Sequence, residues 1–176
     1  MNARHVASAA LATMVLLMGG CSVTPEPNEP TPAFTTEEEA FAAAEETYRA
    51  YVDALNQVDL SDPETFEPVF ALTTGELNES DRTNFSAWHA DGYSLSGQSF
   101  VELIETISTD LPEGGREAKI GACYNVEDVN VLDDAGRSVV EASRPAMQRL
   151  EVTLVRGPAA QGLQISSIHP RVELVC

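Results

Sequence analysis

The sequence predicts an α+β domain in which three helices precede a largely antiparallel sheet of four to six strands. Between residues 36 and 90, apolar residues recur at steps of three and four, which is the period of an amphipathic helix. From about residue 93 onward, apolar and polar residues alternate, as they do in half-buried strands. Because helical patterns come first and strand patterns follow, we expect an α+β fold rather than an alternating α/β fold.

The first two helices carry recognisable start signals. Thr36 stands three residues before Glu39, which is the spacing of a capping box at a helix start. The second helix follows Asp62, a suitable N-cap, with Pro63 in the first turn, where a missing amide is tolerated. Pro68 is expected to bend or divide this helix.

A third helix is expected from about residue 76 to residue 90, and the period then changes from helical to alternating. Turn-forming residues separate the alternating segments. These segments predict strands at residues 93–97, 99–108, 118–132, 137–142, 148–157 and 162–168.

The N-terminal segment has the layout of a secretory signal. A short basic region with Arg4 precedes an apolar run over residues 6–20, which is too short for a membrane-spanning helix of about 20 residues. The run ends with Leu17, Met18 and two glycines before Cys21, and this pattern resembles the lipobox of bacterial lipoproteins. In those proteins the cysteine thiol receives a diacylglyceryl group and becomes the first residue after cleavage. Met18 departs from the usual leucine, and the alternative is an ordinary signal peptide with Cys21 incidental.

A proline-rich tract follows Cys21. Residues 22–34 hold four prolines and few apolar residues, so we expect an extended tether of about 3.1 Å per residue. The expected organisation is a signal peptide at 1–20, a lipidated cysteine and tether at 21–34, and one domain at 35–176. Two acyl chains on Cys21 would make the membrane a partner and hold the chain on the outer face of the cell membrane.

The formal net charge of −18 argues against one class of partner. Nucleic acid and anionic lipid surfaces repel such a charge, so no nucleic-acid partner is expected. The sequence also lacks a phosphate-binding loop, a G-x-S-x-G elbow and a recognisable Ser/His/Asp arrangement. No cofactor is expected.

Cys21, Cys123 and Cys176 make an odd number of cysteines in a chain that is expected to be exported. If Cys21 is lipidated, the other two remain as a pair, which we expect to form a disulfide that pins the C-terminal segment to the sheet. A zinc site is the alternative. Only His89 and His169 follow the signal segment, and no C-x-x-C or H-x-x-x-H spacing occurs, so no metal site is expected.

The order helix, short helix, helix and then strands over residues 35–176 resembles the NTF2-like, or SnoaL-like, cone, in which helices pack on a curved sheet. The stretches "AAEETYRAYVDALNQVDLSDPETFEPVFALTTGE" and "CYNVEDVNVLDDAGRSVV" are similar to lipoproteins of Gram-positive bacteria whose role is unassigned. The resemblance implies a fold and makes a homodimer through the sheet face an arrangement to test. It carries no catalytic motif onto this chain, because the superfamily includes isomerases, dehydratases, binding domains and scaffolds.

The sequence "WHADGY" is the candidate for acid–base chemistry. In this hypothesis His89 is a general base, Asp91 orients it, and Tyr124 or Tyr48 donates to a developing oxyanion. The alternative, which the sequence favours, makes Asp91 and Gly92 a helix-ending turn, with His89 at the surface and the tyrosines in the core.

Five aromatic residues are candidates for the lining of a pocket for an apolar small molecule, with ordinary core packing as the alternative: Tyr51, Phe66, Phe70, Phe85 and Trp88. Two functions remain. The favoured one is a lipid-anchored extracytoplasmic domain with a binding or scaffold role, and the other is a small isomerase or dehydratase acting in the cone. Titratable groups that converge in the cone with shifted pKa values would favour the enzyme. The sequence identifies neither the ligand nor a protein partner.

Overall fold

The structure is a computed structural model that describes residues 34–176, so Cys21 and the expected signal peptide lie outside the described residues. The elements in chain order are α1 (Glu37–Leu55), the 3-10 helix η1 (Pro63–Phe66), α2 (Glu67–Leu72), α3 (Gly75–Ala90), β1 (Ser94–Ser96), β2 (Phe100–Thr109), the 3-10 helix η2 (Leu111–Glu113), β3 (Glu117–Asn125), β4 (Asn130–Leu132), β5 (Met147–Arg156) and β6 (Leu163–Pro170). The expected α+β class is confirmed. The expectation that all helical elements precede the sheet is wrong, because η2 lies between β2 and β3.

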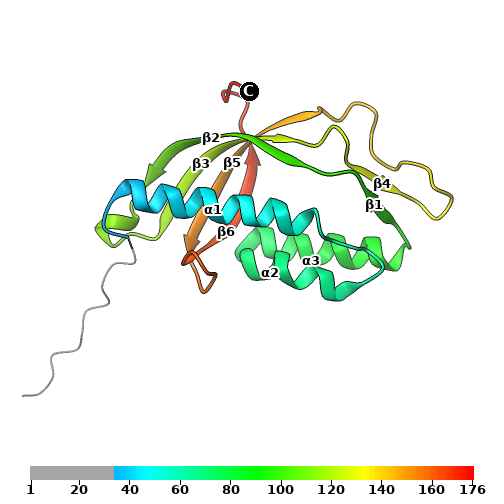
Figure 1. Ribbon diagram of the computed structural model, residues 1–176, viewed down its shortest axis with the longest axis horizontal. Helices are drawn as coiled ribbons and strands as arrows, with labels where there is room; N and C mark the ends of the chain where they lie inside the picture. The colour runs from blue at the N-terminus through cyan, green and yellow to red at the C-terminus, as the bar shows by residue number, and fades with distance from the viewer. Residues whose placement is uncertain (1–33) are drawn as a thin grey trace, which may run out of the picture. The chain divides into compact units, whose positions relative to one another are not determined.

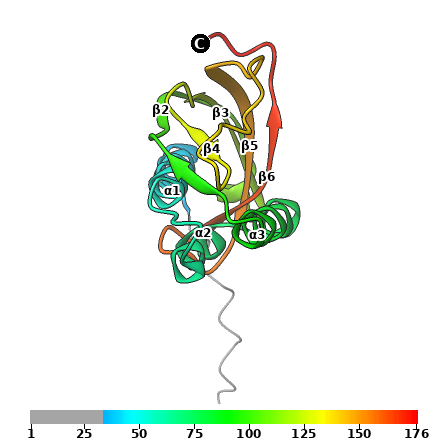
Figure 2. The same cartoon turned by 90° about the vertical axis from the view of Figure 1, so that its right-hand side faces the viewer.

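Four strands form the main sheet in the order β2-β3-β5-β6, and each neighbouring pair is antiparallel. Strands β1 and β4 form a separate antiparallel ribbon. In Figures 1 and 2, helices α1, α2 and α3 lie on one side of the main sheet, and the β1–β4 ribbon extends beyond one end of it. Within the described residues, the opposite face of the sheet carries no helix.

The start of α1 follows the sequence signal. Thr36 Oγ1 accepts a hydrogen bond from the Glu39 amide at 3.2 Å and caps the helix. The Glu39 carboxylate reaches one residue further back than a capping box requires, and accepts bonds from the amide and hydroxyl of Thr35 at 2.8 and 2.7 Å. These hydrogen bonds hold the pKa of Glu39 below its usual value.

Pro68 divides the second helical segment, as expected. The Asp62 carboxylate accepts a bond from the Glu64 amide at 3.1 Å and caps η1, which begins with Pro63. Helix α2 begins at Glu67, so Pro68 lies in its first turn, where the missing amide breaks no intrahelical bond.

The single strand expected over residues 118–132 is wrong, because the chain turns between β3 and β4. Asn125 Oδ1 accepts a bond from the Glu127 amide at 2.9 Å. The Val129 amide then donates to the Val126 carbonyl at 3.1 Å. Because the chain turns here, β4 leaves the main sheet and pairs with β1.

The strand expected over residues 137–142 is also wrong. Asp133 Oδ1 accepts bonds from the amides of Ala135 and Arg137 at 3.0 and 2.8 Å and closes a tight turn. The position beside β3 is occupied by β5, so this segment keeps only an isolated bridge to β4. It belongs to the connection between β4 and β5, residues 133–146.

The core lies between the helices and the inner face of the main sheet. Tyr48 and Tyr51 of α1 stack with ring centroids 6.4 Å apart. They belong to the same buried cluster as Ile120 of β3 and Val152 of β5, which are directly paired across the sheet. Alternation along β3 and β5 puts Lys119 and Glu151 on the other face, where their charged groups lie 3.9 Å apart.

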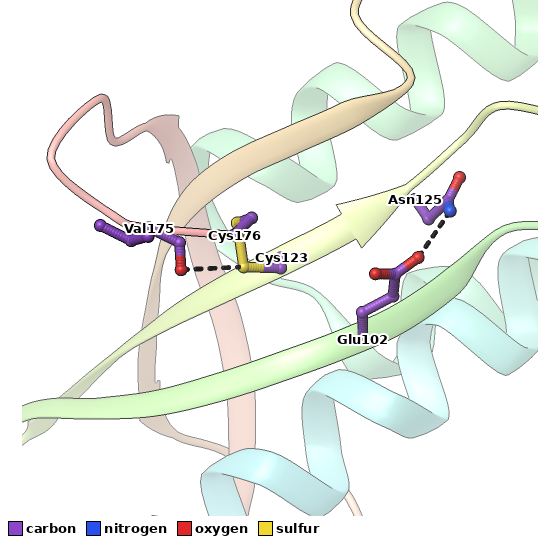
Figure 3. Close-up of a disulfide and its surroundings, with 5 residues drawn as sticks. All are labelled: Glu102, Cys123, Asn125, Val175 and Cys176. Carbon is purple, nitrogen blue, oxygen red and sulfur yellow. Dashed lines mark hydrogen bonds between the residues drawn. A yellow bond between two sulfur atoms is a disulfide. The ribbon is translucent and has the colours of Figure 1, made fainter.

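A disulfide joins Cys123 of β3 to Cys176 with a Cα–Cα distance of 5.7 Å, and this is the pair expected from the sequence. Figure 3 shows the C-terminal segment reaching β3, with the Val175 carbonyl 3.9 Å from the Cys123 sulfur. Beside it, Asn125 of β3 donates to Glu102 of β2 at 2.6 Å. The disulfide thus links the segment after β6 covalently to β3.

Candidate functional site

A cavity of about 310 Å³ lies between the C-terminal end of α1, helix α3 and the β1–β4 ribbon. This volume is at the lower end of the range for small-molecule sites. Apolar side chains supply one part of its wall: Leu55, Val58, Phe85, Trp88, Leu95, Val129 and Val131. Polar and ionisable side chains supply the rest: Asn56, Asp81, Asn84, Ser96, Ser99, Tyr124 and Arg144.

Asp81 is the buried acid of this cavity. It lies on α3 and is 8% exposed. The Tyr51 hydroxyl points at both of its carboxylate oxygens, at 3.5 and 3.4 Å, which is long for an O–H···O bond. Burial raises the pKa of Asp81 to about 6, and the Tyr51 bond opposes this rise only in part.

Two phenols belong to this region: Tyr51 contacts Asp81, and Tyr124 lines the same cavity. Burial raises the pKa of Tyr51 well above its usual value, and the nearby Asp81 charge raises it further. Burial also raises the pKa of Tyr124, which lines the cavity from β3, while the Ser99 hydroxyl and the Arg144 guanidinium lower it by less. Both phenols are therefore protonated at neutral pH and act as hydrogen-bond donors.

An amide–serine pair holds one side of the cavity. Asn56 Oδ1 accepts bonds from the Ser99 amide and hydroxyl, both at 2.9 Å, and Asn56 Nδ2 donates to the Ser99 carbonyl at 2.9 Å. Ser99 is 2% exposed, so these bonds satisfy groups that water cannot reach. They fix the end of α1 to the connection between β1 and β2.

Arg144 fixes a second part of the cavity wall. Its Nη2 donates to the carbonyls of Val126 and Val129 at 2.6 and 2.7 Å. These bonds tie the connection between β4 and β5 to the turn that follows β3. At the same end of the ribbon, Gly97 has φ +80° and passes so close to the Asp128 carbonyl that a Cβ would collide with it.

The structure does not assemble the expected His89–Asp91 pair. His89 Nδ1 lies 2.7 Å from the Leu60 carbonyl, so Nδ1 is the protonated nitrogen, and the ring meets the edge of Phe66. Asp91 is exposed and caps the C-terminus of α3. No hydrogen bond joins these two side chains within residues 34–176, and neither lines the cavity. Tyr124 is the member of the hypothesis that lines it.

The five aromatic candidates divide between the cavity wall and the core behind it. Phe85 and Trp88 line the cavity with ring centroids 6.0 Å apart. Phe66 and Phe70 pack behind Phe85, at centroid distances of 5.2 and 6.0 Å. Tyr51 lies behind Asp81.

Sequence reasoning missed Asp81, Asn56, Ser99 and Arg144. A signal for Asp81 was present, because it stands four residues before Phe85 and therefore on the same face of α3. An acid on the apolar face of a helix marks a position where burial and charge conflict. Arg144 gave no such signal, since its role depends on two carbonyls supplied by a different turn.

Among residues 34–176, no cluster of three or more His, Cys, Asp or Glu side chains is arranged to hold a metal ion. In the same range, no helix is both long enough and apolar enough to cross a membrane. The chain matches no protein-family model, and no curated protein is significantly similar to it.

Proposed function

We propose that the chain is a lipid-anchored binding protein that holds a small organic molecule in the cavity, on the outer face of the cell membrane. The observation that carries the binding role is the mixed wall of the cavity, where aromatic side chains stand beside Asp81 and Tyr124. Small-molecule sites combine apolar walls with a few polar groups in this way. A scaffold would need no such cavity.

The lipid anchor is supported by Cys21, which follows an apolar run and precedes a proline-rich tract. The Cys123–Cys176 disulfide supports export, because disulfides persist in oxidising compartments. For the fold family we propose the NTF2-like cone, supported by three helices on one face of an antiparallel sheet.

Native mass spectrometry of the full chain, purified from its own host in a nonionic detergent, tests both parts. We expect a retained small molecule and an acylated N-terminal cysteine. A Cys21→Ser variant should lose the acyl mass and keep the small molecule. A mass that equals the polypeptide alone would contradict both the anchor and the binding role, and the same spectra would show whether the chain dimerises.

A second candidate is a small enzyme of the isomerase or dehydratase type. Asp81 favours it, since a cavity carboxyl with a pKa of about 6 suits a general base near neutral pH. Tyr124 lines the same cavity and can donate a hydrogen bond. In this hypothesis Asp81 takes the role first assigned to His89. We place binding first because the raised pKa values of Tyr51 and Tyr124 make both phenols weaker acids. Proton exchange at a carbon acid, lost in Asp81→Asn, would support the enzyme.

A further inference from the structure

We infer that the cavity takes an organic cation, such as a substituted ammonium compound, with the positive charge beside Asp81 and the organic body against Phe85 and Trp88. This inference rests on the proposed binding function and names the chemical class of the ligand.

Among the described residues, Asp81 has no charged partner. A carboxylate can accept about four hydrogen bonds, whereas the described residues give Asp81 only the long contacts from Tyr51 at 3.4 and 3.5 Å. The ion pairs found among residues 34–176 do not include it. Because buried charges are normally paired, a cation bound in the cavity would supply the partner that the described residues do not.

The two nearby arginines, Arg82 and Arg144, are held by other groups. Arg82, the next residue on α3, places its guanidinium 4.0 Å from the centre of the Phe70 ring and donates to Asn78. Arg144 lines the cavity, but its Nη2 is held by two backbone carbonyls. A cation from solution therefore meets an acid that forms no ion pair with any of residues 34–176.

The rest of the cavity wall suits the organic part of such a cation. Phe85, Trp88 and Tyr124 line the same cavity as Asp81. Aromatic rings attract cations through their quadrupoles and also cover apolar surface. The formal net charge of −18 raises the local concentration of cations around the whole chain and repels anions.

The test uses three probes of similar size on the full chain carrying Cys21→Ser, so that no acyl chain competes for the cavity. The probes are benzyltrimethylammonium, its neutral isostere neopentylbenzene, and the anion benzylsulfonate. Trp88 is the one tryptophan in the sequence and lines the cavity, so its fluorescence reports binding directly. Calorimetry supplies an independent dissociation constant.

We expect benzyltrimethylammonium to bind at least about tenfold more tightly than either other probe, which corresponds to about 1.4 kcal/mol. Asp81→Asn should remove this preference and leave neopentylbenzene binding unchanged, which also shows that the variant is folded. Glu79→Gln removes the same charge from an exposed position on the same helix and should change nothing.

A neutral or anionic probe that binds as tightly as the cation overturns the ligand class and leaves the binding function standing. An unchanged cation affinity in Asp81→Asn overturns it as well. If none of the three probes binds, the inference is wrong, and the molecule retained in native mass spectra then decides the binding function separately.

Discussion

Replacement of Asp81 by asparagine should stabilise the fold in a pH-dependent way. The side chain is 8% exposed, and its pKa rises from an ordinary 3.8 to about 6 on folding. At pH values between 3.8 and about 6, Asp81 keeps its proton in the folded chain and has lost it in the unfolded chain. The free energy of unfolding therefore falls as pH rises. Asparagine does not ionise, and it can still accept a hydrogen bond from Tyr51.

The size of the effect follows from the shift. The difference between a pKa of 3.8 and one of about 6 corresponds to at most about 3 kcal/mol in the free energy of unfolding. Because the cavity admits solvent, we expect the variant to gain about 1–2 kcal/mol over the wild type at pH 8 and almost nothing at pH 4. Urea denaturation followed by circular dichroism at pH 4, 5, 6, 7 and 8 measures this difference, with Glu79→Gln as the control for net charge. A stability difference that is constant across this range, or that shrinks as pH rises, would refute the reasoning.

Three further variants test the disulfide and the surroundings of the cavity. Cys176→Ser opens the covalent ring and should lower the free energy of unfolding by about 2–4 kcal/mol in urea titrations, whereas an unchanged midpoint would show that the tie contributes nothing. Asn56→Ala leaves the buried amide and hydroxyl of Ser99 without partners, so calorimetric melting should show a loss of about 1–3 kcal/mol together with weaker probe binding. His89→Ala removes the bond to the Leu60 carbonyl and should cost about 1 kcal/mol. Its probe binding should not change, because His89 does not line the cavity, and a loss would restore the original base hypothesis.

Helix boundaries could be predicted because their signals act over a few residues. Thr36 caps α1 and Pro68 divides the second helical segment through contacts within one turn. The strands at residues 118–132 and 137–142 could not be predicted correctly, since alternation says only that a segment can be half-buried. Which segment pairs with β3 depends on competition with β5, and that is a property of the assembled sheet.

The site was harder to predict than the fold. Phe85 and Trp88 were recognised from helical spacing, but spacing does not separate a cavity wall from the core that Phe66 and Phe70 form behind it. The adjacency of a histidine and an acid in "WHADGY" suggested chemistry, yet α3 ends there and the two side chains serve local structure. The cavity instead combines residues from α1, α3, β3 and the connection between β4 and β5.

Asp81 is also the place where the sequence departs most clearly from what folding alone would favour. A leucine or methionine there would continue the apolar face of α3 and remove the cost of a buried acid. The hydrogen bonds that fix the cavity wall come from Asn56, Ser99 and Arg144, and none of them involves Asp81. The cavity wall therefore does not depend on Asp81 for these bonds. Proteins tolerate such local conflicts chiefly where function needs them. A carboxylate that costs stability in the empty cavity and regains it when a cation binds would meet that condition, and the stability and binding measurements on Asp81→Asn test the two halves of this statement separately.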